Sequence, residues 1–277
     1  MVFLICDDKN HFYLDSLKIT LYLIYHQILM YKIIYAMLVL STIQQSMQSQ
    51  TVEPSAAINK NTLQIEIESS YSIQKVGSEK TTSWSIPNTL FRYGLLNGIE
   101  LQMNIPIIKE QLWENDHLKQ SLNKLDNLQV GFSVDLWEEK KLLPEASIMF
   151  RAILPTENKF VLNNIGEIVS LNFANRISEK LSLNYNLGYV NETDQTSSYF
   201  YIANISYLMT SKLHFFIENF GDLHHKKIMS HNLNIGGGYN FTDKLILDIS
   251  ANNGINQNLF YVGGRVTWIL NTNKTKT

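Results

Sequence analysis

From residue 60 onward, apolar and polar residues alternate along most of the chain, as in β-strands with one apolar face. In 89–106, TLFRYGLLNGIELQMNIP, an Asn-Gly pair between two such runs predicts a hairpin. A three-residue loop with Gly98 at positive φ would pair Leu95 with Ile99. This register gathers the apolar residues on one face and leaves Arg92 with its polar neighbours on the other.

The same turn pattern recurs with a fixed period. ISEKLSL begins at Ile177, MTSKLHF at Met209 and FTDKLIL at Phe241, so the copies are 32 residues apart. Each period fits one hairpin plus its connection to the next. The alternation predicts twelve strands, at 62–74, 83–95, 99–107, 126–137, 144–154, 166–177, 181–190, 198–209, 213–220, 230–241, 245–252 and 258–269.

Two kinds of all-β protein are compatible with this pattern, a soluble sandwich and a transmembrane barrel. Three features favour the barrel: strands long enough to cross a bilayer at a tilt, short turns alternating with longer loops such as 109–126 and 221–229, and export of the chain. Aromatic residues near the strand ends match interfacial girdles: Trp84, Tyr93, Tyr189, Tyr199, Tyr239 and Trp268. We therefore expect an all-β, antiparallel, up-and-down transmembrane β-barrel of about twelve strands, preceded by a signal peptide.

The N-terminal part has the layout of an export signal. Residues 30–50 contain a basic start at Lys32, an apolar stretch and a polar region suited to cleavage. Residues 1–29 are interpreted as a mis-assigned upstream start or an extension; read with the following stretch, they could instead form an uncleaved anchor. The remaining expected parts are a periplasmic segment at 51–61, the barrel at 62–270 and a polar tail at 271–277.

Composition removes several classes of function. The net charge of −2 gives no electrostatic basis for nucleic-acid binding. The single cysteine, Cys6, precedes all patterned sequence, so we expect neither disulfides nor a cysteine metal site, and we expect no cofactor. The adjacent His224 and His225 are interpreted as a solvated loop and not as metal ligands. The glycine triplet at 236–238 is placed within a strand, where missing side chains leave room for a neighbour such as Phe216.

Three segments resemble a known family: LQIEIESSYS at the first strand, PNTLFRYGLLNGIEL at the next hairpin and LPEASIMFRAILPT at the fifth strand. They are similar to the outer-membrane β-barrel transporter family named after the meta-pathway of phenol degradation. The resemblance extends over about 60–270 and implies an outer-membrane barrel with a role in the passage of small molecules. It does not imply a particular solute. One departure is the polar tail NTNKTKT after VTWIL, where such barrels commonly end on an aromatic residue.

The charged residues of the polar face are the candidates for lining a lumen and selecting solutes. They are Glu66, Glu68, Arg92, Glu100, Asp135, Glu145, Arg151, Arg176, Glu218, Asp248 and Arg265. Arg92 with Glu100, and Glu145 with Arg151, are predicted ion pairs that rigidify the wall. The seven carboxylates and four arginines leave a net of three negative charges, which favours neutral or cationic solutes.

An enzymatic function is disfavoured. Glu66 and Glu68 project to the same side, yet ionic pairing within a lumen explains them better than acid–base catalysis does. An outer-membrane phospholipase needs an outward Ser-His pair, whereas His214 is predicted to face inward and Ser230 to lie opposite His231.

The function predicted from the sequence is an outer-membrane channel that passes small solutes through a polar lumen. The expected partners are outer-membrane lipid, a small-molecule solute and the barrel-insertion machinery. The alternative is a non-conducting structural or surface-binding barrel that acts through its extracellular loops at 109–126 and 221–229.

Overall fold

The computed structural model describes residues 52–156, 164–224 and 227–272, all β-strand and connecting segments apart from short turns. The predicted signal peptide and the upstream 1–29 lie outside the described residues. The strands are β1 Thr62–Val76, β2 Glu79–Leu96, β3 Ile99–Glu114, β4 His117–Leu125, β5 Leu128–Trp137, β6 Glu145–Leu154, β7 Gly166–Arg176, β8 Leu181–Asn191, β9 Ser197–Leu208, β10 Leu213–His224, β11 Lys227–Thr242, β12 Leu245–Gly254 and β13 Asn258–Asn271.

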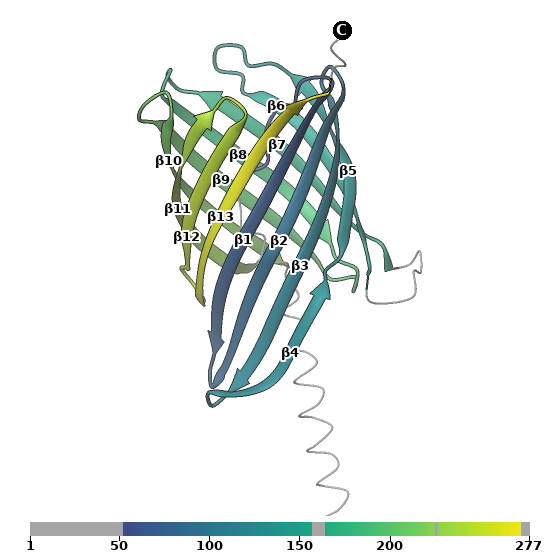
Figure 1. Ribbon diagram of the computed structural model, residues 1–277, viewed down its shortest axis with the longest axis vertical. Helices are drawn as coiled ribbons and strands as arrows, with labels where there is room; N and C mark the ends of the chain where they lie inside the picture. The colour runs from purple at the N-terminus through teal and green to yellow at the C-terminus, as the bar shows by residue number, and fades with distance from the viewer. Residues whose placement is uncertain (1–51, 157–163, 225–226, 273–277) are drawn as a thin grey trace, which may run out of the picture. The chain divides into compact units, whose positions relative to one another are not determined.

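Twelve of these strands form a closed ring. Each pairs antiparallel with its neighbour, and β3 pairs with both β2 and β5. The ring closes where β1 pairs with β13 without a break, from Thr62 opposite Asn271 to Lys75 opposite Asn258. The predicted all-β antiparallel barrel of twelve strands is therefore confirmed (Figure 1).

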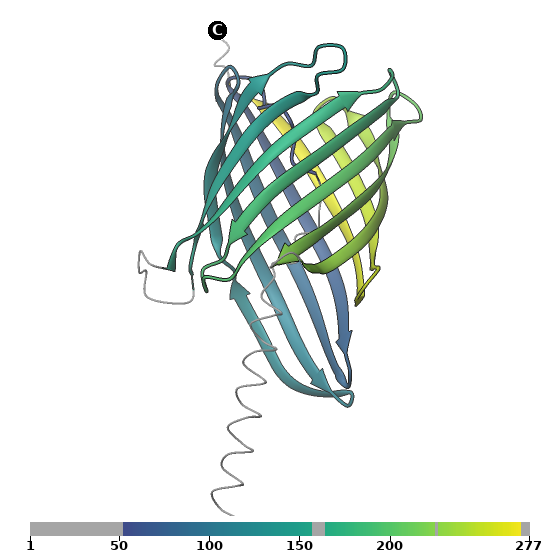
Figure 2. The same cartoon turned by 180° about the vertical axis from the view of Figure 1, so that it is seen from behind.

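The thirteenth strand, β4, lies outside the ring and pairs only with the far part of β3. Together with the far parts of β1, β2 and β3 it forms a four-stranded sheet that projects beyond one end of the barrel (Figures 1 and 2). We call this sheet, residues 69–85 and 107–125, the extension. The prediction of a long loop at 109–126 was wrong, because 109–114 continues β3 and 117–125 forms β4, which pairs with it. Residues 221–224 and 227–229, also expected in a loop, belong to β10 and β11.

The hairpin between β2 and β3 follows the predicted register except at its tip. Phe91 pairs with Met103 and Arg92 with Gln102, as the apolar and polar faces require. Gly98 has the expected positive φ of 75°. At the tip, however, Leu96 and not Leu95 pairs with Ile99, so Leu95 forms a bulge. The bulge restores the correct faces after a two-residue turn.

The barrel buries polar side chains and exposes apolar ones, which is the reverse of the arrangement in a soluble protein. The strands bury polar residues, such as Glu100 and Glu218 (both 0% exposed), and expose large apolar ones, such as Ile249 (65%) and Leu187 (56%). In a twelve-stranded ring the buried row must point into the lumen, since it alternates with the exposed row along each strand. The lumen is therefore lined by hydrogen-bonding groups.

The predicted role of the glycines in β11 is confirmed at Gly236. A Cβ atom added there would lie 2.3 Å from Phe216 Cζ and 2.6 Å from the main-chain oxygen of Ile249. Phe216, which is 7% exposed, fills the space that the missing side chain leaves.

We expect Gly236→Ala to lower the free energy of unfolding by about 1–3 kcal/mol, because the methyl group overpacks the contact with Phe216. Urea unfolding in lipid vesicles measures the change. Gly264→Ala is the matched control, since its Cβ would have no atom nearer than 3.5 Å. Equal midpoints for the two variants would contradict the packing role.

Candidate functional site: the barrel lumen

A buried ion pair occupies the lumen wall where β2 meets β3. Arg92 donates through Nε and Nη2 to the two carboxylate oxygens of Glu100, at 2.9 and 2.8 Å. Glu66 of β1 lies on the other side, with its Oε1 3.8 Å from Arg92 Nη1. Gln102 Nε2 donates to Glu100 Oε1 at 2.5 Å. The predicted Arg92–Glu100 pair is thus formed, and the bidentate geometry fixes both side chains against the wall.

A second charged group lies on β12 and β13, beside β1. Arg265 contacts Glu66 Oε2 at 3.2 Å and Asp248 Oδ2 at 3.4 Å. His214 Nε2 lies 2.9 Å from Asp248 Oδ1. Together with the first pair, these contacts form a continuous band of charge from β3 through β1 to β12.

Neutral polar side chains line the opposite part of the wall. Asn186 Nδ2 donates to Asn172 Oδ1 at 3.0 Å, and Asn172 Nδ2 donates to Ser147 Oγ at 3.3 Å. Further along the ring, Asn204 Nδ2 donates to Glu218 Oε2 at 3.2 Å. These amides support one another across neighbouring strands, so this side of the lumen holds its shape with little charge.

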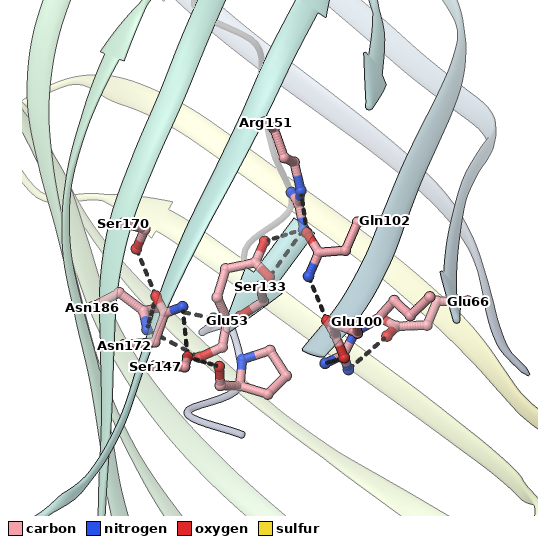
Figure 3. Close-up of polar contacts among 12 residues, drawn as sticks. Glu53, Glu66, Glu100, Gln102, Ser133, Ser147, Arg151, Ser170, Asn172 and Asn186 are labelled. Atoms are coloured by element: carbon pink, nitrogen blue, oxygen red, sulfur yellow. Dashed lines mark hydrogen bonds and ion pairs between the residues drawn. The ribbon is translucent and has the colours of Figure 1, made fainter. Parts of the chain in front are cut away.

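The segment that precedes β1 lies inside the lumen, and Figure 3 shows the contacts of its Glu53 with the wall. Its main-chain N–H groups donate to inward-facing side chains from three different strands: Val52 to Glu218 Oε2 (3.1 Å), Glu53 to Asn186 Oδ1 (2.7 Å) and Ile58 to Glu100 Oε2 (2.8 Å). We call residues 52–58 the luminal segment. These contacts reach from β3 to β10, while the periplasmic segment expected at 51–61 stays a prediction.

Side chains of the luminal segment add further contacts with β6. Glu53 Oε1 lies 2.9 Å from Arg151 Nη2, and Arg151 Nε also donates to Gln102 Oε1 at 2.7 Å. Ser55 Oγ donates to Glu145 Oε1 at 2.5 Å. The predicted pairing of Glu145 with Arg151 was therefore wrong, because each of the two binds the luminal segment instead.

The remaining candidates divide between the lumen and its rim. Glu68 accepts a hydrogen bond from the Tyr261 hydroxyl at 3.0 Å, and Asp135 accepts one from the main-chain N–H of Ala57 at 2.6 Å. Arg176 is exposed at the end of β7, where its main-chain N–H donates to Glu139. Arg176 therefore lies at the rim of the barrel, apart from the luminal contacts described above.

Sequence reasoning missed Glu53, because no alternation extends upstream of β1 to mark it as inward-facing. It also passed over Gln102, a neutral residue between the two arginines. Gln102 could have been found, since it shares the polar face with Glu100.

The geometry of a lipid hydrolase is incomplete. Asn219 Nδ2 lies 2.8 Å from His231 Nε2, an arrangement that could orient a histidine. The neighbouring hydroxyl of Ser230, however, donates to Asp222 Oδ2 at 2.6 Å, on the other side of the strand. The outward Asn-His pair therefore has no Ser230 nucleophile.

In the described ranges, no group of three or more His, Cys, Asp or Glu residues could hold a metal ion. No described helix is long and apolar enough to cross a membrane.

Comparison with known proteins identifies the family. The family model described as "Putative MetA-pathway of phenol degradation" matches residues 42–269, most of the chain. The chain belongs to this family. The resemblance predicted from the strand and hairpin sequences is thereby confirmed, whereas no curated protein sequence matches the chain.

Solved structures of other outer-membrane proteins have a barrel similar to that of this family member. An outer membrane channel from Pseudomonas putida F1 superposes with a TM-score of 0.60 at 11% identity, covering 79% of this chain and 100% of that one. The transport unit of the autotransporter AIDA-I from Escherichia coli gives a TM-score of 0.52 at 10% identity, covering 82% and 94%. At these identities the likeness concerns the fold.

The protein is an outer-membrane β-barrel, as predicted, and its exposed apolar row faces lipid. Aromatic side chains near the strand ends are exposed, among them Trp84 (40%), Tyr199 (64%) and Trp268 (52%). Tyr189 and Tyr199 also contact each other, with ring centroids 5.4 Å apart. These positions are those of interfacial girdles.

We expect Glu100→Gln to lower the free energy of unfolding by about 3–5 kcal/mol, because it leaves Arg92 buried beside a neutral amide. Urea unfolding in vesicles tests this. Glu114→Gln is the control, because its pair with Lys119 is half exposed and is expected to contribute less than about 1 kcal/mol. A cost for Glu100→Gln no larger than the control's would show that the buried pair is unimportant for stability.

A pH dependence is expected at the turn after β8. Burial, followed by the nearby carboxylates of Asp194, Asp126 and Asp222, raises the pKa of Glu192 from 4.5 to about 7. Protonated Glu192 therefore makes its full contribution to the free energy of unfolding below pH 4.5, and this contribution is lost as the pH rises through 7. Glu192→Gln should raise the free energy of unfolding by about 1 kcal/mol at pH 8, after allowance for solvent screening, and change little at pH 4.

Unfolding measured at both pH values checks this expectation. The same substitution at the exposed Glu179, in a turn at the other end of the barrel, is the control. A gain for Glu192→Gln that is equal at pH 4 and pH 8 would exclude titration as its cause.

Proposed function

We propose that this protein is an outer-membrane channel for small solutes, and that the luminal segment occupies its pathway in the closed state. The observation that carries the proposal is the set of contacts from residues 52–58 to inward-facing side chains around the ring. The segment is held to the wall by hydrogen bonds and by the ion pair between Glu53 and Arg151. Water and ions can replace such contacts, so the segment can leave without unfolding the barrel.

The wall supports a passage for polar solutes once the segment has moved. Glu100, Asp135 and Glu218 each accept a main-chain N–H from the segment, and each would then regain one acceptor position. Glu100 Oε2 would stay bonded to Arg92, and Glu218 Oε2 to Asn204. The departing Glu53 would release Arg151, which stays bonded to Gln102. The opened pathway would thus present carboxylates on one side and the amides of Asn172 and Asn186 on the other.

We infer a preference for neutral or cationic solutes over anions. Within the wall, Arg92 and Arg265 are held by carboxylates, at Glu100 and at Glu66 and Asp248 respectively. Glu218 instead accepts hydrogen bonds from the amides of Asn204 and Asn234 and from a main-chain N–H, and Asp135 accepts one from a main-chain N–H. The accessible charge is therefore negative in sum, which repels anions in a narrow pathway.

The alternative is a barrel that stays closed and acts through its exposed surfaces. The presence of the luminal segment in the lumen favours this closed barrel, if the occupied lumen is the resting state. The contacts that hold the segment are polar, however, and the wall behind them has hydrogen bonds that do not involve the segment.

We expect deletion of residues 52–58 to raise single-channel conductance in planar bilayers several-fold, because the deletion removes the peptide from the pathway. Deletion of residues 272–277, beyond the last strand, is the matched control and should leave conductance unchanged. A salt gradient across the same bilayer gives the ion selectivity, which should favour cations.

Each result of this measurement has a definite meaning. Equal conductance of the deletion variant and the full chain would overturn the occluding role. The absence of conductance from both, with a heat-modifiable band that shows a folded barrel, would support the closed alternative. Equal permeability to cations and anions would refute the inferred charge selectivity alone.

A further inference from the structure

The outer face of the extension carries lysines and no strand carboxylate. Since β1 pairs with β13 without a break, its alternation continues, and Tyr71 and Lys75 lie on the same face as the lipid-facing Ile67. Residues directly opposite in the neighbouring strands share this face: Lys80 opposite Lys75, Trp84 opposite Tyr71, and Lys109 opposite Trp84. The charged strand residues of the outer face at these positions are all lysines.

The inner face carries both signs of charge, since Lys124 lies opposite Ile108 on this face and Lys119 Nζ lies 3.1 Å from Glu114 Oε2. Glu79 and Glu114 are directly opposite each other, and Glu110 lies opposite Ser83, which pairs with the buried Ser72. These residues share the face that continues the lumen wall. The strand carboxylates of the extension all lie on this inner face, whereas the charged strand residues of the outer face are lysines, so the outer face attracts negative groups.

Two of the lysines are held close together. Lys75 and Lys80 are cross-strand partners, and like charges directly opposite each other destabilise a sheet. Lys80 Nζ lies 3.2 Å from Asp116 Oδ1 and 4.9 Å from the centre of the Trp113 ring. Among the described residues, no carboxylate is paired with Lys75 or with Lys109, and both side chains are exposed. A bound anion would relieve the repulsion between Lys75 and Lys80.

The position of this face in the membrane indicates which kind of anion can reach it. The tight turns at Asn97-Gly98, 177–180, 209–212 and 243–244 lie at the opposite end of the barrel, as do the start of β1 and the end of β13. In outer-membrane barrels that end is periplasmic, so the extension is on the extracellular side. The rings of Tyr71 and Trp84 lie 4.3 Å apart between centroids on this outer face, and aromatic residues of this kind are enriched at the level of lipid head groups.

We propose that the outer face of the extension, formed by Lys75, Lys80, Lys109, Tyr71 and Trp84, binds the phosphate groups of an anionic glycolipid in the outer leaflet. The two levels of lysines are four residues apart along the strands, roughly 13 Å. This spacing suits a head group with more than one phosphate. The aromatic rings lie over the sugars and acyl boundary while the ammonium groups bind the phosphates. The proposal depends on the outer-membrane location and not on conduction.

The test is binding of purified bisphosphorylated lipid A, in mixed detergent micelles, to the full chain purified from outer membranes. Tryptophan fluorescence reports binding, since Trp84 and Trp113 lie on the outer face. The triple variant Lys75→Gln, Lys80→Gln, Lys109→Gln should bind roughly a hundredfold more weakly, at about fivefold per lysine. Lipid A without phosphates should bind the native chain about as weakly.

The matched control removes three lysines from the tight turns at the other end, Lys180→Gln, Lys212→Gln and Lys244→Gln. It has the same net charge as the test variant and should keep its affinity to within about twofold. Heat modifiability on gels confirms that both variants fold.

Three results would overturn the proposal. The two triple variants could lose affinity equally, which would indicate a general charge effect. Dephosphorylated lipid A could bind as tightly as the phosphorylated form. Inorganic phosphate or a polyglutamate peptide could displace the lipid at comparable concentration, which would indicate an isolated anion site or an acidic protein partner.

Discussion

A backbone N–H or C=O group inside a bilayer has no water to bond to, so a strand with a free edge is costly there. The pairing of β1 with β13 removes that edge, and every other feature of the barrel depends on it. Once the ring is closed, one face of each strand must meet lipid and the other must meet the lumen. The exposed Ile249 and the buried Glu218 follow from the same constraint.

Closure also creates an enclosed space whose polar groups need partners. Buried charges are stable only when they are paired or hydrogen-bonded. Part of this requirement is met across strands, as between Arg92 and Glu100, and part by the luminal segment, as between Arg151 and Glu53. The segment thus completes the hydrogen bonding of the wall, and its departure exposes groups that water must then solvate.

Much of the barrel could be predicted from the sequence because alternation is a local property. The repeated turns with Lys180, Lys212 and Lys244 fixed the strand count, and the register at Phe91 and Met103 followed from keeping one face apolar. Alternation also placed Glu66, Arg92 and Asp248 in the lumen. It could not show which of them touch, since Glu145 and Arg151 share a face and yet bind different partners. The position of residues 52–58 depends on contacts with distant strands, which leave no local signal. Strand β4 was missed because its residues were judged as a loop between two short strands.

The extension has a mechanical consequence for the wall beneath it. Because β3 leaves the ring to pair with β4 from Ile107 onward, its contact with β5 is confined to six residue pairs, from Ile99 opposite Val134 to Asn104 opposite Gln129. The other described seams of the ring are longer, and the one between β1 and β13 runs the full length of the barrel. Amide protons along 99–104 and 129–134 are therefore held by the shortest ladder in the ring. Any transient parting of the wall would begin between β3 and β5, beside the Arg92–Glu100 pair that braces it from within.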